Sequence, residues 1–130
     1  MPQAEVVFYK DADGTVPVRE WLFDLQKKNR RAFAKCNARI HRLADLGYEL
    51  RRPEADILRD EIHELRAKLG HVNYRILYFF HGRNLAVLAN ALVKKDKVPD
   101  VEIERAVRRR KAFLQAPQAH SFYQGDEDNG

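Results

Sequence analysis

Cysteine is scarce in this sequence: Cys36 is the one cysteine among 130 residues. A lone cysteine cannot form an internal disulfide, which is typical of proteins from a reducing compartment. No run approaches the roughly 20 consecutive apolar residues that a membrane span needs. The first residues turn polar too soon to form the apolar core of a signal peptide. We therefore expect a cytoplasmic protein that does not bind a membrane.

The motifs that bind nucleotide cofactors or activate a serine are also missing. The sequence contains no phosphate-binding P-loop, no G-x-G-x-x-G fingerprint and no G-x-S-x-G elbow. Its histidines are scattered and lack the spacing of metal ligands. They are His41, His63, His71, His81 and His120. We therefore expect function without a metal ion or a cofactor.

What remains is the composition of an ordinary globular domain with a basic excess. Hydrophobic residues make up 45% of the chain and charged residues 33%, which excludes a disordered protein. The 24 lysines and arginines outnumber the 19 acidic residues, giving a formal net charge of +5. That excess suits an anionic partner, and it equally suits a soluble basic protein without one.

The hydrophobic pattern predicts an α+β fold. In order, we expect an N-terminal strand, two helices, a three-stranded antiparallel meander and a C-terminal helix. The expected positions are 5–10 for the first strand, 17–47 for the two helices, 62–69, 72–80 and 85–93 for the meander, and 101–114 for the last helix. The helical pair should be interrupted near Lys28 and Asn29. Residues 1–116 should form a single domain, residues 48–61 a polar connection, and residues 117–130 a flexible tail.

Two arginines, Arg66 and Arg75, interrupt the apolar runs of the meander. Because side chains alternate across a strand, two-residue turns at "GH" and "GR" would place Arg66, Arg75 and Asn90 in one line on one face. Lys68, Asn73 and Lys94 would share that face, which we expect to be partly open with a basic centre. The other face would meet the helices, and it collects Leu65, Ala67, Tyr74, Ile76, Tyr78, Val87, Ala89, Ala91 and Val93.

Neighbouring arginines on adjacent strands repel each other, so an anion should lie between them. A phosphate group is one candidate, because the planar guanidinium donates two parallel hydrogen bonds to it. The other candidate is a carboxylate of the protein, either Glu64 or an acidic residue of the last helix. The sequence leaves both possibilities open.

Several motifs together resemble one protein family. They are "ELR" at 64–66, "VNYRILYFF" at 72–80, Lys94–Lys95, "P..EIE.A..R" in the last helix, and "G..PV.EWL..L" at 14–25. Over about residues 6–114 the chain resembles the phage-derived Gp49-like, HigB-type branch of the RelE/ParE toxin superfamily. The resemblance implies a RelE-like toxin whose partner is a helix-turn-helix antitoxin of the Xre or HigA type.

For the function, the resemblance implies a ribosome-dependent endoribonuclease that cleaves messenger RNA without a metal. Two alternatives stay open. ParE-like relatives instead inhibit DNA gyrase, and fold alone does not choose the target. A weakened copy would bind only its antitoxin; this chain has "NALVKK" where many relatives have an aromatic residue in "GF.KK".

The resemblance and the charge pattern together nominate site residues. Arg66, Arg75, Lys94 and Lys95 are the expected catalytic residues, with the arginines bracing a phosphate in the transition state. Further residues are expected to bind messenger or ribosomal RNA: Lys68, Asn73, Asn90, Arg108, Arg109, Arg110 and Lys111. The last four could equally serve to complement the dipole of the C-terminal helix.

Overall fold

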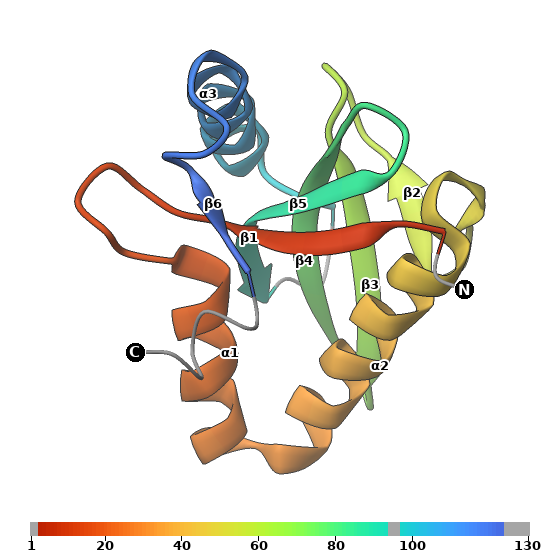
Figure 1. The fold of residues 1–130 in the computed structure, drawn as a ribbon. Helices are drawn as coiled ribbons and strands as arrows, with labels where there is room; N and C mark the ends of the chain where they lie inside the picture. The colour runs from red at the N-terminus through yellow and green to blue at the C-terminus, as the bar shows by residue number, and fades with distance from the viewer. Residues whose placement is uncertain (1–2, 94–96, 124–130) are drawn as a thin grey trace.

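The computed structural model describes residues 3–93 and 97–123 of the chain. A mixed six-stranded sheet lies between two helices on one face and a third helix on the other (Figure 1). The elements are β1 Glu5–Tyr9, α1 Pro17–Lys28, α2 Arg30–Leu46, the 3₁₀ turn η1 Gly47–Glu49, β2 Ala55–Ile57, β3 His63–Leu69, β4 Val72–His81, β5 Leu85–Val93, α3 Asp100–Gln115 and β6 Ser121–Phe122. The α+β class and the expected order of the main elements are confirmed.

The strands lie in the order β2-β3-β4-β5-β1-β6. The N-terminal strand β1 runs parallel to β5, and the other neighbours are antiparallel. Two short strands were not predicted. One is β2, within a segment expected to be a polar connection, and the other is β6, which pairs Ser121 and Phe122 with β1. The expectation of a loose tail beyond residue 116 is therefore wrong for residues 117–123.

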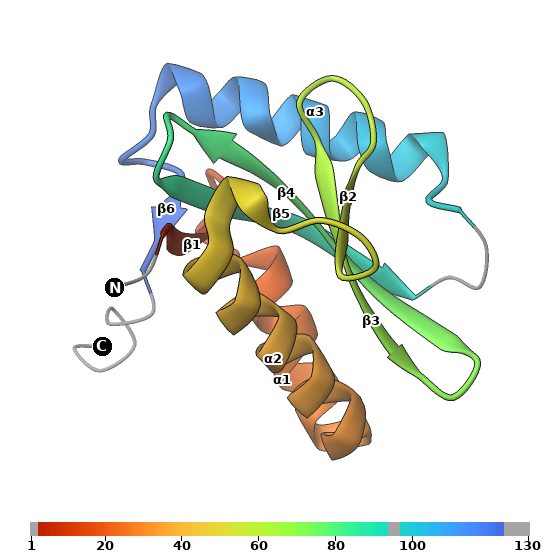
Figure 2. The same ribbon diagram turned by 90° about the vertical axis from the view of Figure 1, so that its right-hand side faces the viewer.

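A single asparagine separates the two N-terminal helices, as the sequence predicted. The N–H of Asn29 donates to Leu25 at the end of α1, and its side-chain oxygen accepts from the Ala32 N–H at 3.1 Å to begin α2. Asparagine is a favoured N-cap because it satisfies a backbone N–H that has no partner in the helix. The result is a tight helical hairpin that packs across the sheet (Figure 2).

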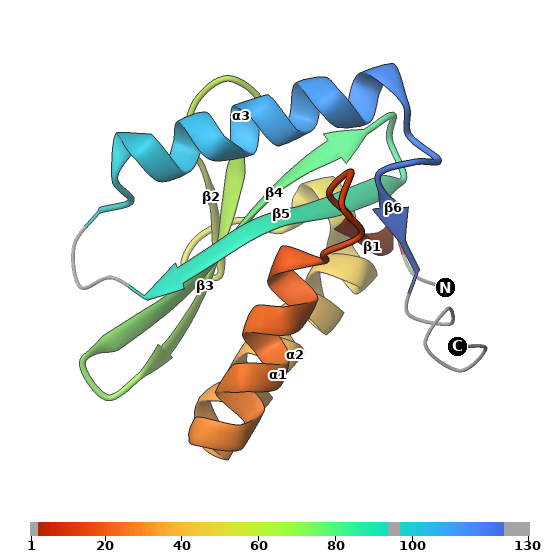
Figure 3. The ribbon, with the colours of Figure 1, turned by 90° about the vertical axis from the view of Figure 1, so that its left-hand side faces the viewer.

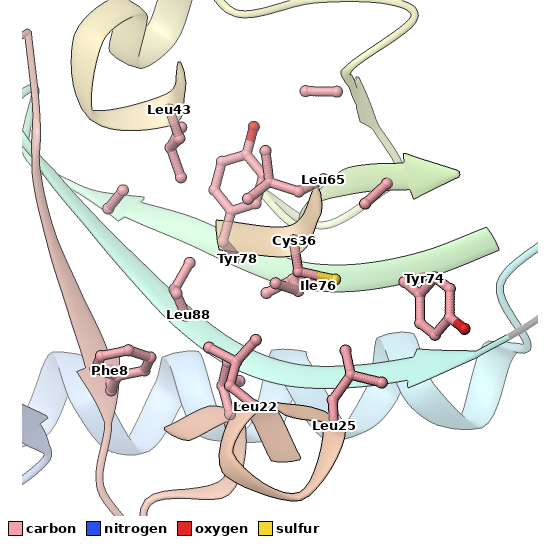
Figure 4. Packing of buried hydrophobic residues seen from close by; sticks show 14 of the residues in the cluster. Phe8, Leu22, Leu25, Cys36, Leu43, Leu65, Tyr74, Ile76, Tyr78 and Leu88 are labelled. Carbon is pink, nitrogen blue, oxygen red and sulfur yellow. The ribbon is translucent and has the colours of Figure 1, made fainter. Parts of the chain in front are cut away.

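The main core lies between this helical hairpin and the sheet. Figure 4 shows Leu22 and Leu25 of α1 and Cys36 and Leu43 of α2 facing the side chains of the central strands. Cys36 is 1% exposed, and burial raises the pKa of its thiol to about 12. The lone cysteine is thus a packing residue in its protonated form.

A second core lies on the opposite face, beneath α3 (Figure 3). Ile103, Ala106 and Phe113 of α3 contact a buried cluster that includes Phe79 and Val87 of the sheet. The expectation that this face is partly open is therefore wrong over β4, β5 and β1. What extends past α3 is the end of the β3–β4 hairpin (Figures 2 and 3).

The register of the meander follows the prediction in one hairpin and departs from it in the other. Arg66 lies opposite Arg75, as expected. The β4–β5 loop has one residue more than expected, since His81 pairs with Leu85, and Gly82 takes the left-handed φ of 65° that such a loop requires. This shift places Val87 and Ala89 beneath α3 rather than on the face of the other predicted core residues, such as Leu65 and Ile76. Leu88 instead faces the helical hairpin.

A bulge between Leu77 and Tyr78 then shifts the pairing by a second residue. Arg75 therefore lies opposite Leu92, and Asn90 lies opposite Leu77. The predicted line of Arg66, Arg75 and Asn90 across three strands is wrong. Because two shifts of one residue restore the alternation, Asn90 still projects from the same face as the arginines.

The pH dependence of folding should depend in part on His63, which is buried beside the rings of Tyr78 and Phe80. Burial lowers the pKa of His63 from its usual 6.5, and the charge of Arg51 lowers it further. Protonation therefore favours the unfolded chain. The contribution of neutral His63 to the free energy of unfolding should be fully present above about pH 6.5. It should be lost as the pH falls through the lowered pKa of His63.

We predict that His63→Gln, which is neutral at every pH, shows a smaller loss of stability between pH 7 and pH 5 than the unmodified protein. Urea unfolding followed by circular dichroism measures both. If the free energy of unfolding falls equally in the two proteins between pH 7 and pH 5, His63 is not buried in its neutral form.

Candidate functional site

Arg66 and Arg75 converge on one carboxylate in the β3–β4 hairpin. Nη1 of Arg75 donates to both oxygens of Glu64, at 2.9 and 2.8 Å. Nε of Arg66 donates to Oε1 of the same carboxylate at 2.6 Å. The protein's own Glu64, one of the anions that the sequence left open, thus lies between the arginines.

This cluster continues toward the edge of the sheet. Nη2 of Arg66 donates to Oδ2 of Asp56 at 3.0 Å, and the same oxygen accepts from Nε of Arg52 at 3.0 Å. Three guanidinium groups meet two carboxylates, so the chain Arg75–Glu64–Arg66–Asp56–Arg52 keeps one uncompensated positive charge. We call these five residues the arginine–carboxylate cluster.

The two arginines differ in their access to solvent. Arg75 is buried, with 7% of the residue exposed, and Glu64 is 1% exposed. The side chain of Arg66 remains 31% exposed. The side chain of Arg66 can therefore be reached from solvent, whereas Arg75 is enclosed and donates to Glu64 from beneath.

The backbone of Arg66 is held from two sides. Its N–H donates to the Glu54 carbonyl at 2.8 Å, and its carbonyl accepts from Nε of Arg39, in α2, at 2.9 Å. Glu54 in turn binds the side chains of Arg39 and Arg42. Such fixed surroundings pre-organise the guanidinium of Arg66.

Two carboxyl groups around Arg66 are held in the charged form. The pKa of Asp56 is lowered: burial acts to raise it, but hydrogen bonds from Arg52 and the Ile57 N–H, with the charge of Arg66, outweigh burial. Hydrogen bonding from Arg42 lowers the pKa of Glu54. Both groups therefore stay ionised and orient their arginines over the working pH range.

The other predicted residues of the hairpin lie at different depths. Lys68 is exposed and lies opposite the half-buried Asn73 at the end of the hairpin. Asn90 is buried, and its Nδ2 donates to the carbonyl and the carboxylate of Glu102, in α3, at 3.1 Å each. An RNA strand cannot reach Asn90 there. Lys94 and Lys95 lie outside the described residues.

The basic run of α3 divides into separate surfaces. Arg108 and Lys111 are exposed. Arg109 turns inward, where its Nη1 donates to the Ala89 carbonyl at 2.8 Å. Arg110 is half-buried. These four residues, predicted as one patch, therefore do not share a single face.

Asp56 and Arg52 were not predicted as site residues, because the polar segment around Pro53 is typical of a connection between elements. The alternation of Ala55, Asp56 and Ile57 before a strand was the available signal for β2. In the described parts of the chain, no three histidine, cysteine or acidic side chains gather as metal ligands would. None of the helices described there is both apolar and long enough to cross a membrane.

Comparison with known proteins identifies the family. The family model described as phage-derived protein Gp49-like matches residues 20–111, which include the whole arginine–carboxylate cluster. The chain belongs to this family, which is the family of HigB-type toxins. Membership places the protein in the context of toxin–antitoxin pairs. A search of curated proteins finds no match.

The burial difference within the cluster predicts unequal effects on stability. Arg75→Met would leave the buried Glu64 with one guanidinium fewer, and breaking a buried ion pair costs about 3–5 kcal/mol. Arg66→Met should cost about 1 kcal/mol, because the pair is partly exposed and Glu64 keeps Arg75. The measurement is urea unfolding of both variants.

The double variant Glu64→Gln/Arg75→Met supplies the control. It should be more stable than Arg75→Met alone, because a neutral amide is buried in place of a carboxylate that has only the partly exposed Arg66 left as a guanidinium partner. If Arg75→Met unfolds at the same urea concentration as Arg66→Met, the buried pair is not a determinant of stability.

Proposed function

We propose that this protein is the toxin of a toxin–antitoxin pair and that it cleaves messenger RNA on the translating ribosome. Its partners would then be a helix-turn-helix antitoxin, messenger RNA and ribosomal RNA. Family membership supports the toxin role. The observation that carries the action on RNA is a pre-organised, solvent-reachable Arg66 with a net positive charge around it.

Arg66 has the hydrogen-bonding capacity that this role needs. A guanidinium carries five N–H donors, and two of them serve Glu64 and Asp56. Nη1 of Arg66 makes no hydrogen bond with any part of the chain that the structure describes. It is therefore available to the non-bridging oxygens of a phosphate, where a charge-assisted hydrogen bond is strong.

The proposed reaction is an internal transesterification. The 2′-hydroxyl of one nucleotide attacks the adjacent phosphorus, the bond to the 5′-oxygen breaks, and a 2′,3′-cyclic phosphate forms. The 2′-hydroxyl loses its proton and the leaving 5′-oxygen gains one. Arg66 would stabilise the negative charge that builds on the phosphate oxygens.

Arg75 takes a revised part in this proposal. We expected it to touch the phosphate, but its burial suits a positioning residue that fixes Glu64, which in turn fixes Arg66. Lys68 would bind the RNA backbone beside Arg66. Lys94 and Lys95, which follow β5 in the sequence, stay candidates for proton transfer or for binding the phosphate.

A second candidate is a copy that binds its antitoxin but does not cleave RNA. Two observations favour it: Arg75 is sealed from solvent, and the residues before the lysines, Leu92 and Val93, can neither transfer a proton nor stack on a base. In this case the arginine–carboxylate cluster would only stabilise the hairpin.

The two candidates differ in their response to Arg66→Gln. If Arg66 stabilises the transition state, its loss should lower RNA cleavage about 10²–10³-fold and relieve growth arrest, while Arg66→Lys keeps part of the activity. The measurement is growth after induction in a bacterium, with message ends mapped by primer extension. Arg83→Gln, an exposed arginine at the β4–β5 loop, is the matched control.

Circular dichroism must show that each variant folds. Full toxicity of a folded Arg66→Gln variant would refute the proposed role. Growth arrest with intact messages and trapped gyrase complexes would indicate a ParE-like inhibitor. If the unmodified protein causes no growth arrest but still binds its antitoxin, it is the non-cleaving copy.

A further inference from the structure

A second basic site lies away from the arginine–carboxylate cluster, between α3 and the end of β1. A cavity of about 270 Å³ is lined by Tyr9, Asp11, Arg105, Arg108 and Arg109. Figure 3 shows the C-terminal end of α3 leading into β6, which lies beside β1. We call this cavity the α3–β1 pocket.

Contacts within the protein hold the side chains at the wall of the pocket. Arg109 is anchored to the Ala89 carbonyl, and its guanidinium carbon lies 5.6 Å from the centre of the Tyr9 ring. His120 stacks on Tyr9 with ring centres 5.2 Å apart and planes 3° apart. Nδ1 of His120 lies 2.7 Å from the Lys10 carbonyl oxygen. Tyr9 is thus already in contact with two side chains, which favours recognition of an anion over stacking of a base.

The charges around the pocket favour an anion. Three arginines face one carboxylate, Asp11, whose Oδ2 lies 3.8 Å from Nη2 of Arg109. Arg105 is also paired with Glu102 at 2.9 Å, which leaves one net positive charge. Arg108 makes no hydrogen bond or ion pair with the residues at 3–93 and 97–123. Its donors are the ones that a ligand could engage.

We propose that the α3–β1 pocket binds a backbone phosphate of a single-stranded RNA, with Arg108 as the principal donor and Asp11 as a built-in competitor. Phosphate suits the pocket because guanidinium groups match its oxygens. The choice of RNA over an acidic protein rests on the proposed function. Asp11 would limit affinity, because its negative charge shares the pocket with the phosphate and repels it.

The test measures binding of a short, fluorescent, 2′-O-methylated RNA by anisotropy at several salt concentrations. That probe lacks the attacking hydroxyl, so the proposed cleavage cannot consume it. Arg108→Gln should weaken binding several-fold and reduce the slope of log affinity against log salt by about 0.7. Arg31→Gln, an exposed arginine on α2, is the matched control and should have a smaller effect.

Asp11→Asn should change the RNA affinity in the opposite direction. It should tighten RNA binding several-fold, whereas Asp24→Asn, an exposed acidic residue of α1, should change binding little. If Arg108→Gln and Arg31→Gln change RNA binding equally, or if the two asparagine variants do, the proposed phosphate binding in the pocket is refuted. A poly-glutamate peptide that displaces the RNA at low concentration would assign the pocket to an acidic protein and overturn the RNA proposal.

The outcome is separable from that of the proposed function. Suppose that Arg66→Gln stays toxic while Arg108→Gln and Asp11→Asn change RNA binding as stated. The proposed phosphate binding in the α3–β1 pocket is then supported, and the proposed role of Arg66 in cleavage is refuted. Suppose instead that Arg66→Gln abolishes cleavage while Arg108→Gln leaves the RNA affinity and its dependence on salt unchanged. Only the proposed phosphate binding in the α3–β1 pocket is then refuted. Thermal unfolding of each variant excludes loss of structure as the cause.

Discussion

The ion pair between Glu64 and Arg75 is the constraint around which the hairpin is built. Two arginines on neighbouring strands repel each other, and each would be costly to bury alone. The Glu64 carboxylate accepts from both and removes the repulsion. This arrangement fixes the register of β4 against β3. If β4 slipped by one residue, Arg75 would point to the opposite face of the sheet, into the core beneath the helical hairpin. The pair thus serves register as well as charge balance.

Burial gives the two arginines different roles although they lie directly opposite each other. Arg75, enclosed in the sheet, donates to the buried Glu64. Arg66, nearer the sheet edge, is held by Glu64 and Asp56 at two donors, and its side chain stays partly exposed. A guanidinium with part of its donors committed loses less freedom when it binds a phosphate than a mobile surface arginine would. The two carboxylates that offset part of the cluster's positive charge therefore also orient its exposed member.

The sequence was sufficient for the class of fold, for the helical hairpin and for the facing of Arg66 and Arg75, because these follow from local signals: apolar periodicity, an asparagine cap and a short turn at Gly70. It was insufficient where tertiary packing decides. The third residue of the β4–β5 loop and the bulge at Leu77 each shift β5 by one position, and no local signal marks the bulge. Asn90 was misplaced for that reason, and Arg75 was expected near solvent because a strand pattern does not tell which helix covers each face.

The position of α3 links these errors to the distribution of charge. Because α3 packs on the sheet through Ile103, Ala106 and Phe113, it covers the face that the arginines share and divides the basic residues into two regions. One is the hairpin end with Arg66 and Lys68; the other is the α3–β1 pocket around Arg108. Two cationic regions on either side of one helix suit a long anion better than a small one, because a polymer can engage both at once and gain affinity from each.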